Sequence, residues 1–166
     1  MNIIAGSILV AFSLLGCARE PLSPAAPGVD IPLTRFTTEP SSFLHYSGFN
    51  TSARTIVGDR LTWRAVWDAL YRRQSEIPPL PEVDFSKEEI LVAALGERGS
   101  GGFSIVFQGA SGNDSGGVDV VVKSGSPGNG CAALTVLTQP VDIARIPKVN
   151  GAVHFVERAS VSNCGR

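Results

Sequence analysis

The clearest periodic pattern along the chain is helical. Four large apolar residues recur at i, i+3, i+4 and i+7, the spacing of one helical face: Trp63, Val66, Trp67 and Leu70. Asp59 offers a side-chain oxygen as N-cap, so we predict a helix from there to about Arg73. Two tryptophans one turn apart can form an aromatic ligand site, but helical spacing favours core packing. We therefore expect both rings to be buried.

The other apolar segments have the patterns of β-strands. Residues 90–95 are continuously apolar, as in a strand covered on both faces. The remaining segments alternate, or nearly alternate, apolar with polar residues, as in strands with one covered face. The predicted strands cover residues 55–57, 90–95, 103–107, 118–122, 133–137, 141–146 and 153–157.

Glycine-rich segments separate several of these strands. Residues 99–102, 112–117 and 125–130 are interpreted as turns, because glycine and asparagine tolerate the positive φ that hairpins require. The pattern as a whole predicts an α+β fold. We expect a curled antiparallel sheet of five or six strands, sandwich-like or barrel-like, with one main helix packed on it.

The N-terminal pattern is that of a lipoprotein signal. An uncharged apolar run from Ile3 to Gly16 has the length of a signal h-region and ends in a small residue before Cys17. Residues 1–16 are therefore predicted to be a signal peptide, and Cys17 the lipid anchor. The alternative is a core helix with a buried thiol. Residues 17–42 are rich in Pro, Ser, Ala and Thr, which predicts a flexible tether, and residues 43–166 are expected to form the globular domain.

Charge and export narrow the possible partners. The chain has 14 basic and 15 acidic residues, scattered along its length, so it lacks the basic patch of a nucleic-acid-binding protein. A lipidated Cys17 implies the cell envelope. Ala18 rather than aspartate follows it, which favours the outer membrane.

The two remaining cysteines predict a disulfide. Cys131 and Cys164 are paired by elimination in a chain expected to reach an oxidising compartment. A metal site is the competing interpretation, but His45 and His154 stand at no recognisable ligand spacing from either thiol. We expect no metal and no cofactor.

Few motifs indicate catalysis. The segment from Asn113 to Gly117 resembles the nucleophile segment of chymotrypsin-like serine proteases, with Ser115 as the nucleophile. Such a serine needs a histidine held by a carboxylate, and neither His45 nor His154 lies in a matching context. We interpret the segment as a hairpin turn, and we expect His154 on the solvent side of a strand.

Several motifs together resemble one known family. The two tryptophans of the predicted helix are followed by residues 78–85 and Ser86-Lys87-Glu88-Glu89, then by Gly101-Gly102-Phe103-Ser104-Ile105, and finally by Ile146-Pro147-Lys148 before a Val-x-Phe strand. This order resembles the C-terminal domain of PrcB-type proteins over most of residues 54–157. That family is described as protease-complex or protease-stability proteins. The resemblance implies a non-catalytic envelope accessory protein.

These observations leave two functional hypotheses. The first is a tethered protein-binding module that stabilises, assembles or regulates a protease or another envelope partner. Its partner-binding loop would be Gly99, Ser100, Gly101, Gly102 and Phe103, a flexible segment ending in an aromatic anchor. The same loop also fits a plain hairpin with Phe103 in the core. The alternative function is a small hydrolase or ligand-binding enzyme, which requires Ser115 and a histidine within hydrogen-bond reach in a pocket.

Overall fold

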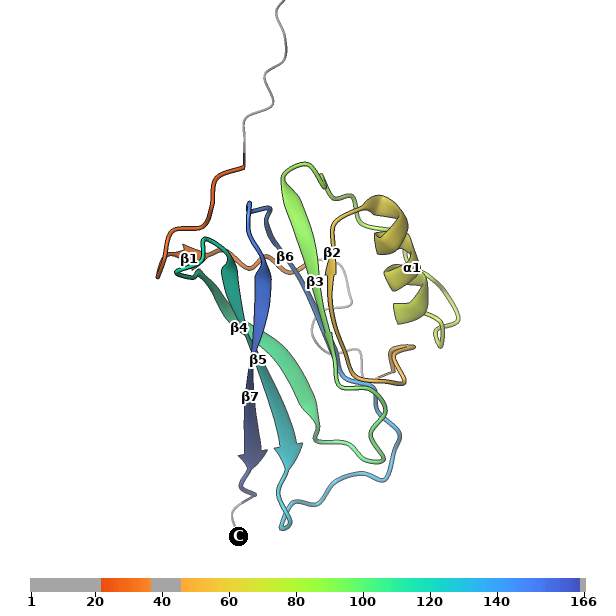
Figure 1. Ribbon diagram of the computed structural model, residues 1–166. Coiled ribbons are helices and arrows are strands. Elements are labelled where there is room, and N and C mark those ends of the chain that lie inside the picture. The colour runs from red at the N-terminus through yellow and green to blue at the C-terminus, as the bar shows by residue number, and fades with distance from the viewer. Residues whose placement is uncertain (1–21, 37–45, 165–166) are drawn as a thin grey trace, which may run out of the picture.

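The computed structural model describes residues 22–36 and 46–164, which form two β-sheets and a helix in three layers (Figure 1). The helix α1 spans Arg60–Leu70. The strands are β1 (Asp30–Ile31), β2 (Ala53–Val57), β3 (Glu88–Ala94), β4 (Ser104–Gly112), β5 (Val118–Pro127), β6 (Val141–Pro147) and β7 (Val153–Ser162).

The strands divide into a four-stranded and a three-stranded sheet. The four-stranded sheet has the order β1-β4-β5-β7 and the three-stranded sheet has the order β2-β3-β6. All neighbouring strands are antiparallel except β5 and β7, which run parallel from Val118 and Val153 to Pro127 and Ser162. The fold is therefore mostly β. The prediction of a single antiparallel sheet of five or six strands was wrong, because apolar alternation shows that one face of a strand is covered but not which strand lies beside it.

Strand β3 explains how the three layers hold together. Its residues Ile90 to Ala94 are fully buried, which confirms the prediction of a strand covered on both faces. Leu91 and Ala93 belong to the cluster between the two sheets, whereas Ile90 and Val92 belong to the cluster under the helix. Alternate side chains of one central strand thus serve two cores.

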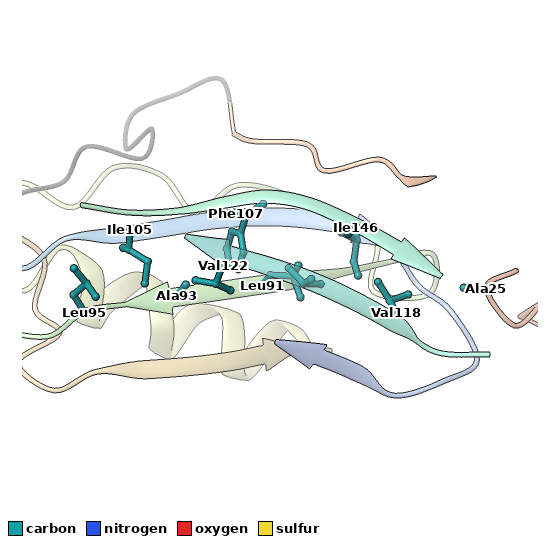
Figure 2. Close-up of a cluster of buried hydrophobic side chains, with 12 residues drawn as sticks. Ala25, Leu91, Ala93, Leu95, Ile105, Phe107, Val118, Val122 and Ile146 are labelled. Atoms are coloured by element: carbon teal, nitrogen blue, oxygen red, sulfur yellow. The ribbon is translucent and has the colours of Figure 1, made fainter. Parts of the chain in front are cut away.

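The core between the sheets is aliphatic with one large aromatic ring. Figure 2 shows side chains from both sheets meeting in it. The four-stranded sheet contributes Ile105, Phe107, Val118, Val120 and Val122, and the three-stranded sheet contributes Leu91, Ala93, Ala144 and Ile146. This face-to-face packing of two sheets is that of a β-sandwich.

The second core lies under the short helix α1. Asp59 caps this helix by accepting hydrogen bonds from the Thr62 N–H (2.8 Å) and hydroxyl (2.7 Å), and these bonds hold the pKa of Asp59 below its ordinary value. The helix ends at Leu70, three residues earlier than predicted. No helix within residues 22–36 and 46–164 has the length and apolarity to cross a membrane.

Both tryptophans of α1 lie in this core, as predicted. Trp63 and Trp67 are each 1% exposed, and their ring centroids are 5.2 Å apart. Each indole N–H donates to a carbonyl of the proline-rich segment that follows the helix, at 3.1 Å to Pro81 and 2.8 Å to Pro78. The extended proline-rich segment therefore lies against the two rings, and its carbonyl groups accept the hydrogen bond of each indole N–H, the only polar group of the side chain.

Residues 22–36 form a strap across the sandwich. The composition of residues 17–42 predicts a flexible tether, and the structure differs from this prediction over the described residues 22–36. Ala25 is buried, β1 pairs with β4, and Thr34 exchanges two backbone hydrogen bonds of 2.9 Å with Arg145 of β6. Backbone pairing with existing strands, together with the packing of Ile31, Leu33 and Phe36 against the two cores, orders this segment.

The predicted strand at residues 133–137 is absent. These residues form a connection to β6 in which Leu134 is 80% and Leu137 is 51% exposed. Only single bridges follow, from Thr138 to Arg98 and from Gln139 to Tyr46. The alternating pattern was misleading here because it does not show whether a partner strand lies beside the segment.

Candidate functional site

One end of the sandwich gathers the segments that the sequence singled out. We call it the loop end, and define it as residues 98–103, 127–137 and 159–164, the last of which comprise the end of β7 and the two residues after it. It lies opposite the end at which the strap enters the fold (Figure 1). Strands β5 and β7 both finish here, and β4 begins here.

The predicted partner-binding loop, residues 99–103, is held firmly at this end. The Gly101 N–H donates to the Leu134 carbonyl (2.9 Å), and the Thr138 hydroxyl donates to the Ser100 carbonyl (3.0 Å). Gly102 has φ +85° and packs against the ring of Pro127, so a side chain at this position would be strained. Residues 99–103 therefore form a turn that is fixed against the rest of the domain.

Phe103 faces inward from this loop. Its ring is half-buried, packs on the core between the sheets and lies 5.7 Å from the guanidinium carbon of Arg98. The aromatic ring considered as an anchor for a partner is thus an anchor of the loop to its own domain. A binding partner would therefore contact the surface around Phe103 and not the ring itself.

Two hollows flank the Gly102–Pro127 contact. The first, of about 250 Å³, lies between Phe103, Arg98 and the ends of β5 and β7. The second, of about 340 Å³, lies between Gly101, Gly102, Leu134 and the two cysteines. Among the described residues that line the two hollows, Arg98 is the only one with a charged side chain.

Exposed apolar side chains border these hollows. Leu134 is 80%, Val161 is 63% and Leu137 is 51% exposed, and the first two are lining residues. Single exposed leucines are common on protein surfaces, but a group of them beside concave, nearly uncharged surface is typical of an interaction site. The loop end therefore offers shape and apolar area with little charge to desolvate.

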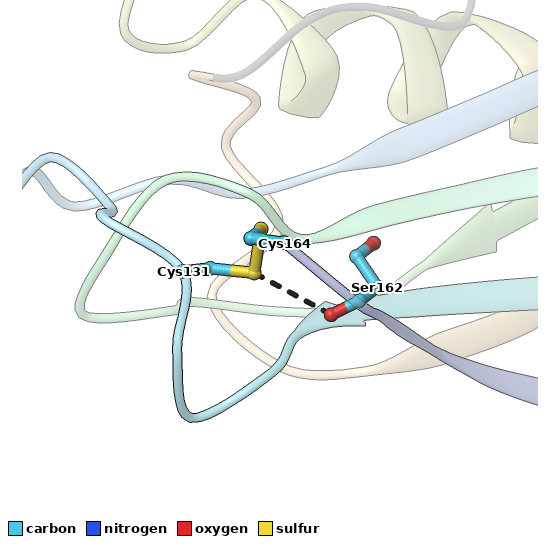
Figure 3. The surroundings of a disulfide bond; sticks show 3 residues. All are labelled: Cys131, Ser162 and Cys164. Atoms are coloured by element: carbon cyan, nitrogen blue, oxygen red, sulfur yellow. Dashed lines mark hydrogen bonds between the residues drawn. A yellow bond between two sulfur atoms is a disulfide. The ribbon is translucent and has the colours of Figure 1, made fainter. Parts of the chain in front are cut away.

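A disulfide joins Cys131 to Cys164 at the loop end, with their Cα atoms 5.0 Å apart (Figure 3). The bond closes a loop with a sequence separation of 33 residues. Cys131 Sγ lies 3.4 Å from the Ser162 carbonyl oxygen, and this oxygen accepts a hydrogen bond from the Gly128 N–H (3.1 Å). The end of β7 is thereby fixed to the segment that forms one wall of the second hollow.

Reduction of this disulfide should lower the free energy of unfolding by about 3.5 to 4 kcal/mol, because the crosslink restricts the unfolded chain over a loop of about thirty residues. Urea unfolding with and without reductant measures the loss. The Cys131→Ser/Cys164→Ser variant is the control, and it should match the reduced protein and no longer respond to reductant. A loss below about 1 kcal/mol would contradict the expectation.

Strand β7 leaves one backbone edge without a strand partner among the described residues. The Val118 N–H donates to the Ala152 carbonyl (2.9 Å), and the Gly128 N–H donates to the Ser162 carbonyl. Even-numbered residues of β7 therefore direct their backbone groups to β5, and odd-numbered residues direct theirs outward. Glu157 of this edge pairs with Arg54 of β2, Nε to Oε1 at 2.6 Å. Beyond that ion pair, Ala159 and Val161 expose the edge beside the first hollow.

The residues considered for catalysis lie at the other end or on the outer surface. Ser115 is exposed in the turn between β4 and β5, and its hydroxyl donates to Asn113 Oδ1 (2.8 Å), which also accepts from the Gly117 N–H (2.9 Å). The segment is thus a turn, as predicted. His154 is exposed on β7, also as predicted. Within the described ranges no hydrogen bond joins Ser115 to a histidine, and His45 and Cys17 lie outside them.

The described residues contain no group of three or more His, Cys, Asp or Glu side chains placed to hold a metal ion. One carboxyl group is nevertheless unusual. Glu89 lies almost buried at the start of β3, and its Oε1 has no hydrogen-bond partner in the described part of the chain. Burial raises the pKa of Glu89, and the charge of Lys148 opposes that rise only in part.

The Glu89→Gln variant should be more stable than the original protein at pH 7. Because the folded pKa is raised, the folded state retains its proton where the unfolded state has lost it, so stability falls as the pH rises above the ordinary value of 4.5. The gain should shrink toward zero at about pH 3, where the carboxyl group is protonated in both states. Urea unfolding at several pH values measures it, with exposed Glu82→Gln as control. An equal gain at both pH values would contradict the assignment.

Sequence reasoning missed Leu134 and the strap. Leu134 was expected inside a strand, and nothing in the alternation of residues 133–137 distinguishes a strand from an exposed connection. The strap was missed because its composition is that of a linker, and its partners are far away in the sequence. Arg35 of the strap pairs with Asp142, a separation of 107 residues.

Comparison with known proteins adds one finding. No curated protein and no solved structure matches the chain. A family model described as PrcB C-terminal matches residues 90–147. The matched segment runs from β3 through β4 and β5 to β6, and it includes residues 99–103 and 127–137 of the loop end. Over this segment, which holds much of the core between the sheets and most of the loop end, the chain is similar to the PrcB C-terminal family.

Proposed function

We propose that this protein is a non-catalytic accessory lipoprotein of the cell envelope, which binds a protease or another envelope protein through the loop end. The observation that carries the proposal is the pair of hollows bordered by Leu134 and Val161, whose described lining residues include a single charged side chain. The PrcB-type proteins that the chain resembles are described as protease-complex or protease-stability proteins, which favours a protease as the partner. Binding would stabilise, assemble or regulate that partner.

Three features of the loop end fit protein recognition. The docked loop 99–103 and the disulfide keep the surface in one conformation, so binding costs little ordering entropy. The exposed leucines supply apolar area beside the hollows. The outward backbone groups of Ala159 and Val161 can pair with an extended segment of the partner.

The membrane attachment in this proposal rests on the sequence. Cleavage after Gly16 would leave Cys17 as a lipidated N-terminus, and Ala18 favours the outer membrane. The non-catalytic assignment is supported by the hydroxyl of Ser115, which donates to Asn113 in an exposed turn instead of to a base.

Two equally exposed leucines provide a matched test of the binding surface. Leu134 at the loop end is 80% exposed and Leu61 on α1 is 82% exposed. A photo-crosslinking amino acid at position 134 should trap a defined envelope protein in the native host, and the same group at position 61 should not. With that partner purified, Leu134→Glu should raise the dissociation constant at least tenfold, which corresponds to a loss of about 1.4 kcal/mol of binding free energy.

The control variant Leu61→Glu should leave the affinity unchanged, and both variants should unfold within about 0.5 kcal/mol of the original protein. Equal affinities for the two variants would remove the loop end as the binding surface. Purified protein that cleaves a peptide or ester, with the activity lost in Ser115→Ala, would favour the hydrolase alternative.

A further inference from the structure

The strap begins at the end of the sandwich opposite the loop end. We call it the anchor end, defined by the turn 113–117 and the connection 148–152. The Ala25 N–H donates to the Gly116 carbonyl (3.1 Å), and the Asn150 N–H donates to the Ser23 carbonyl (3.4 Å). Ala25 is 8% exposed and belongs to the core between the sheets. Residues 23–25 are thus fixed on this end (Figure 1).

From there the strap is attached to every layer of the fold. Its residues 30–31 pair with β4, and Thr34 pairs with Arg145 of β6. The Arg35 guanidinium binds Asp142, and the Phe36 ring stacks on Trp63 of the helix layer with 5.4 Å between centroids. Attachment at four separate places makes the strap part of the folded domain.

This attachment leaves a short connection to residue 17. Cys17 and Leu22 are five residues apart, which spans at most about 18 Å when fully extended. The ten residues of β7 run from the anchor end to the loop end, and at about 3.3 Å per residue the two ends are roughly 33 Å apart. The connection is therefore shorter than the sandwich.

We propose that the strap fixes the orientation of the domain on its membrane, with the anchor end against the lipid surface and the loop end directed away from it. The proposal rests on the lipid anchor at Cys17 that forms part of the proposed function. An inverted domain would place residue 22 about 33 Å from the lipid, beyond the reach of five residues. A 26-residue flexible tether would have allowed every orientation.

The orientation can be measured on vesicles independently of natural acylation. The chain from Cys17 onward, with its disulfide intact, is coupled through the Cys17 thiol to a maleimide-headgroup lipid in phosphatidylcholine vesicles. A fluorescent donor is placed through an azide-bearing amino acid at exposed Asp114 of the anchor end or exposed Asn129 of the loop end. Energy transfer to an acceptor lipid should be at least about twofold greater from position 114.

A 20-residue Gly-Ser insertion between Pro21 and Leu22 is the control. It should bring the two transfer efficiencies close together while the circular dichroism spectrum stays unchanged, because the insertion lengthens the connection without touching the strap. Equal transfer in the original chain, or greater transfer from position 129, would overturn the proposal. So would an unchanged difference after the insertion. Mass spectrometry of the native protein tests acylation separately, so failure of the anchor and failure of the orientation are distinguishable.

Discussion

Replacing Arg35 with alanine should lower the free energy of unfolding by about 4 kcal/mol. Its partner Asp142 has a fully buried side chain that accepts from Arg35 Nη2 (2.9 Å) and from the Phe107 N–H (2.7 Å). The same Nη2 also donates to the Phe107 carbonyl (2.8 Å). Without the guanidinium, a carboxylate remains inside the sandwich with one backbone donor, and such a charge is costly to bury.

Urea unfolding measures this loss, and two variants control it. Arg64→Ala removes an exposed arginine of α1 and should cost less than about 0.5 kcal/mol. Adding Asp142→Asn to Arg35→Ala should recover part of the stability, because it removes the uncompensated charge. A loss below about 1.5 kcal/mol for Arg35→Ala, or no recovery in the double variant, would show that the strap contributes little to the fold.

Replacing Trp67 with alanine should cost about 3 to 5 kcal/mol. The ring is 1% exposed and lies 5.2 Å from the ring of Trp63 and 4.8 Å from that of Tyr71, between centroids. Its removal leaves a cavity between α1 and the three-stranded sheet, and it leaves the Pro78 carbonyl without its 2.8 Å hydrogen bond. Both effects act on the same layer and should loosen the helix first.

Leu61→Ala is the matched control on the same helix, because Leu61 is 82% exposed. It should cost less than about 0.5 kcal/mol in urea unfolding. Trp67→Phe should fall between the two, since it retains part of the ring and loses the indole N–H. Equal costs for Trp67→Ala and Leu61→Ala would mean that the helix layer is not packed as described.

Trp67 and Asp142 show which buried residues can be predicted from the local sequence pattern and which cannot. The burial of Trp67 follows from a helical period of large apolar residues, which one segment carries by itself. The burial of Asp142 does not follow from its neighbours, because an acidic residue inside an apolar strand finds its partner 107 residues away. Arg35 was counted with a linker because its own segment is rich in small and turn-forming residues.

Some features of the loop end could likewise be predicted from the sequence, and others could not. The cysteine pair and the glycine loop 99–103 were visible in the sequence because cysteine and clustered glycine have few alternative uses in a domain that is predicted to be exported. Leu134, the two hollows and the outer edge of β7, which has no partner strand among the described residues, were not visible in the sequence. They exist because the ends of β5 and β7, the loop and the disulfide are brought to one end of the sandwich.

The sequence by itself determined the helix with its cap and buried tryptophans, the double-faced strand β3, most of the other strands and the turn at Ser115, because each depends on residues within one turn or one strand. Tertiary structure decided the division into two sheets, the parallel pairing of β5 with β7, the exposure of residues 133–137 and the docking of the strap. These features depend on which strand edges and buried charges come together from distant parts of the sequence. The pattern of side chains along one strand does not specify which strand lies beside it.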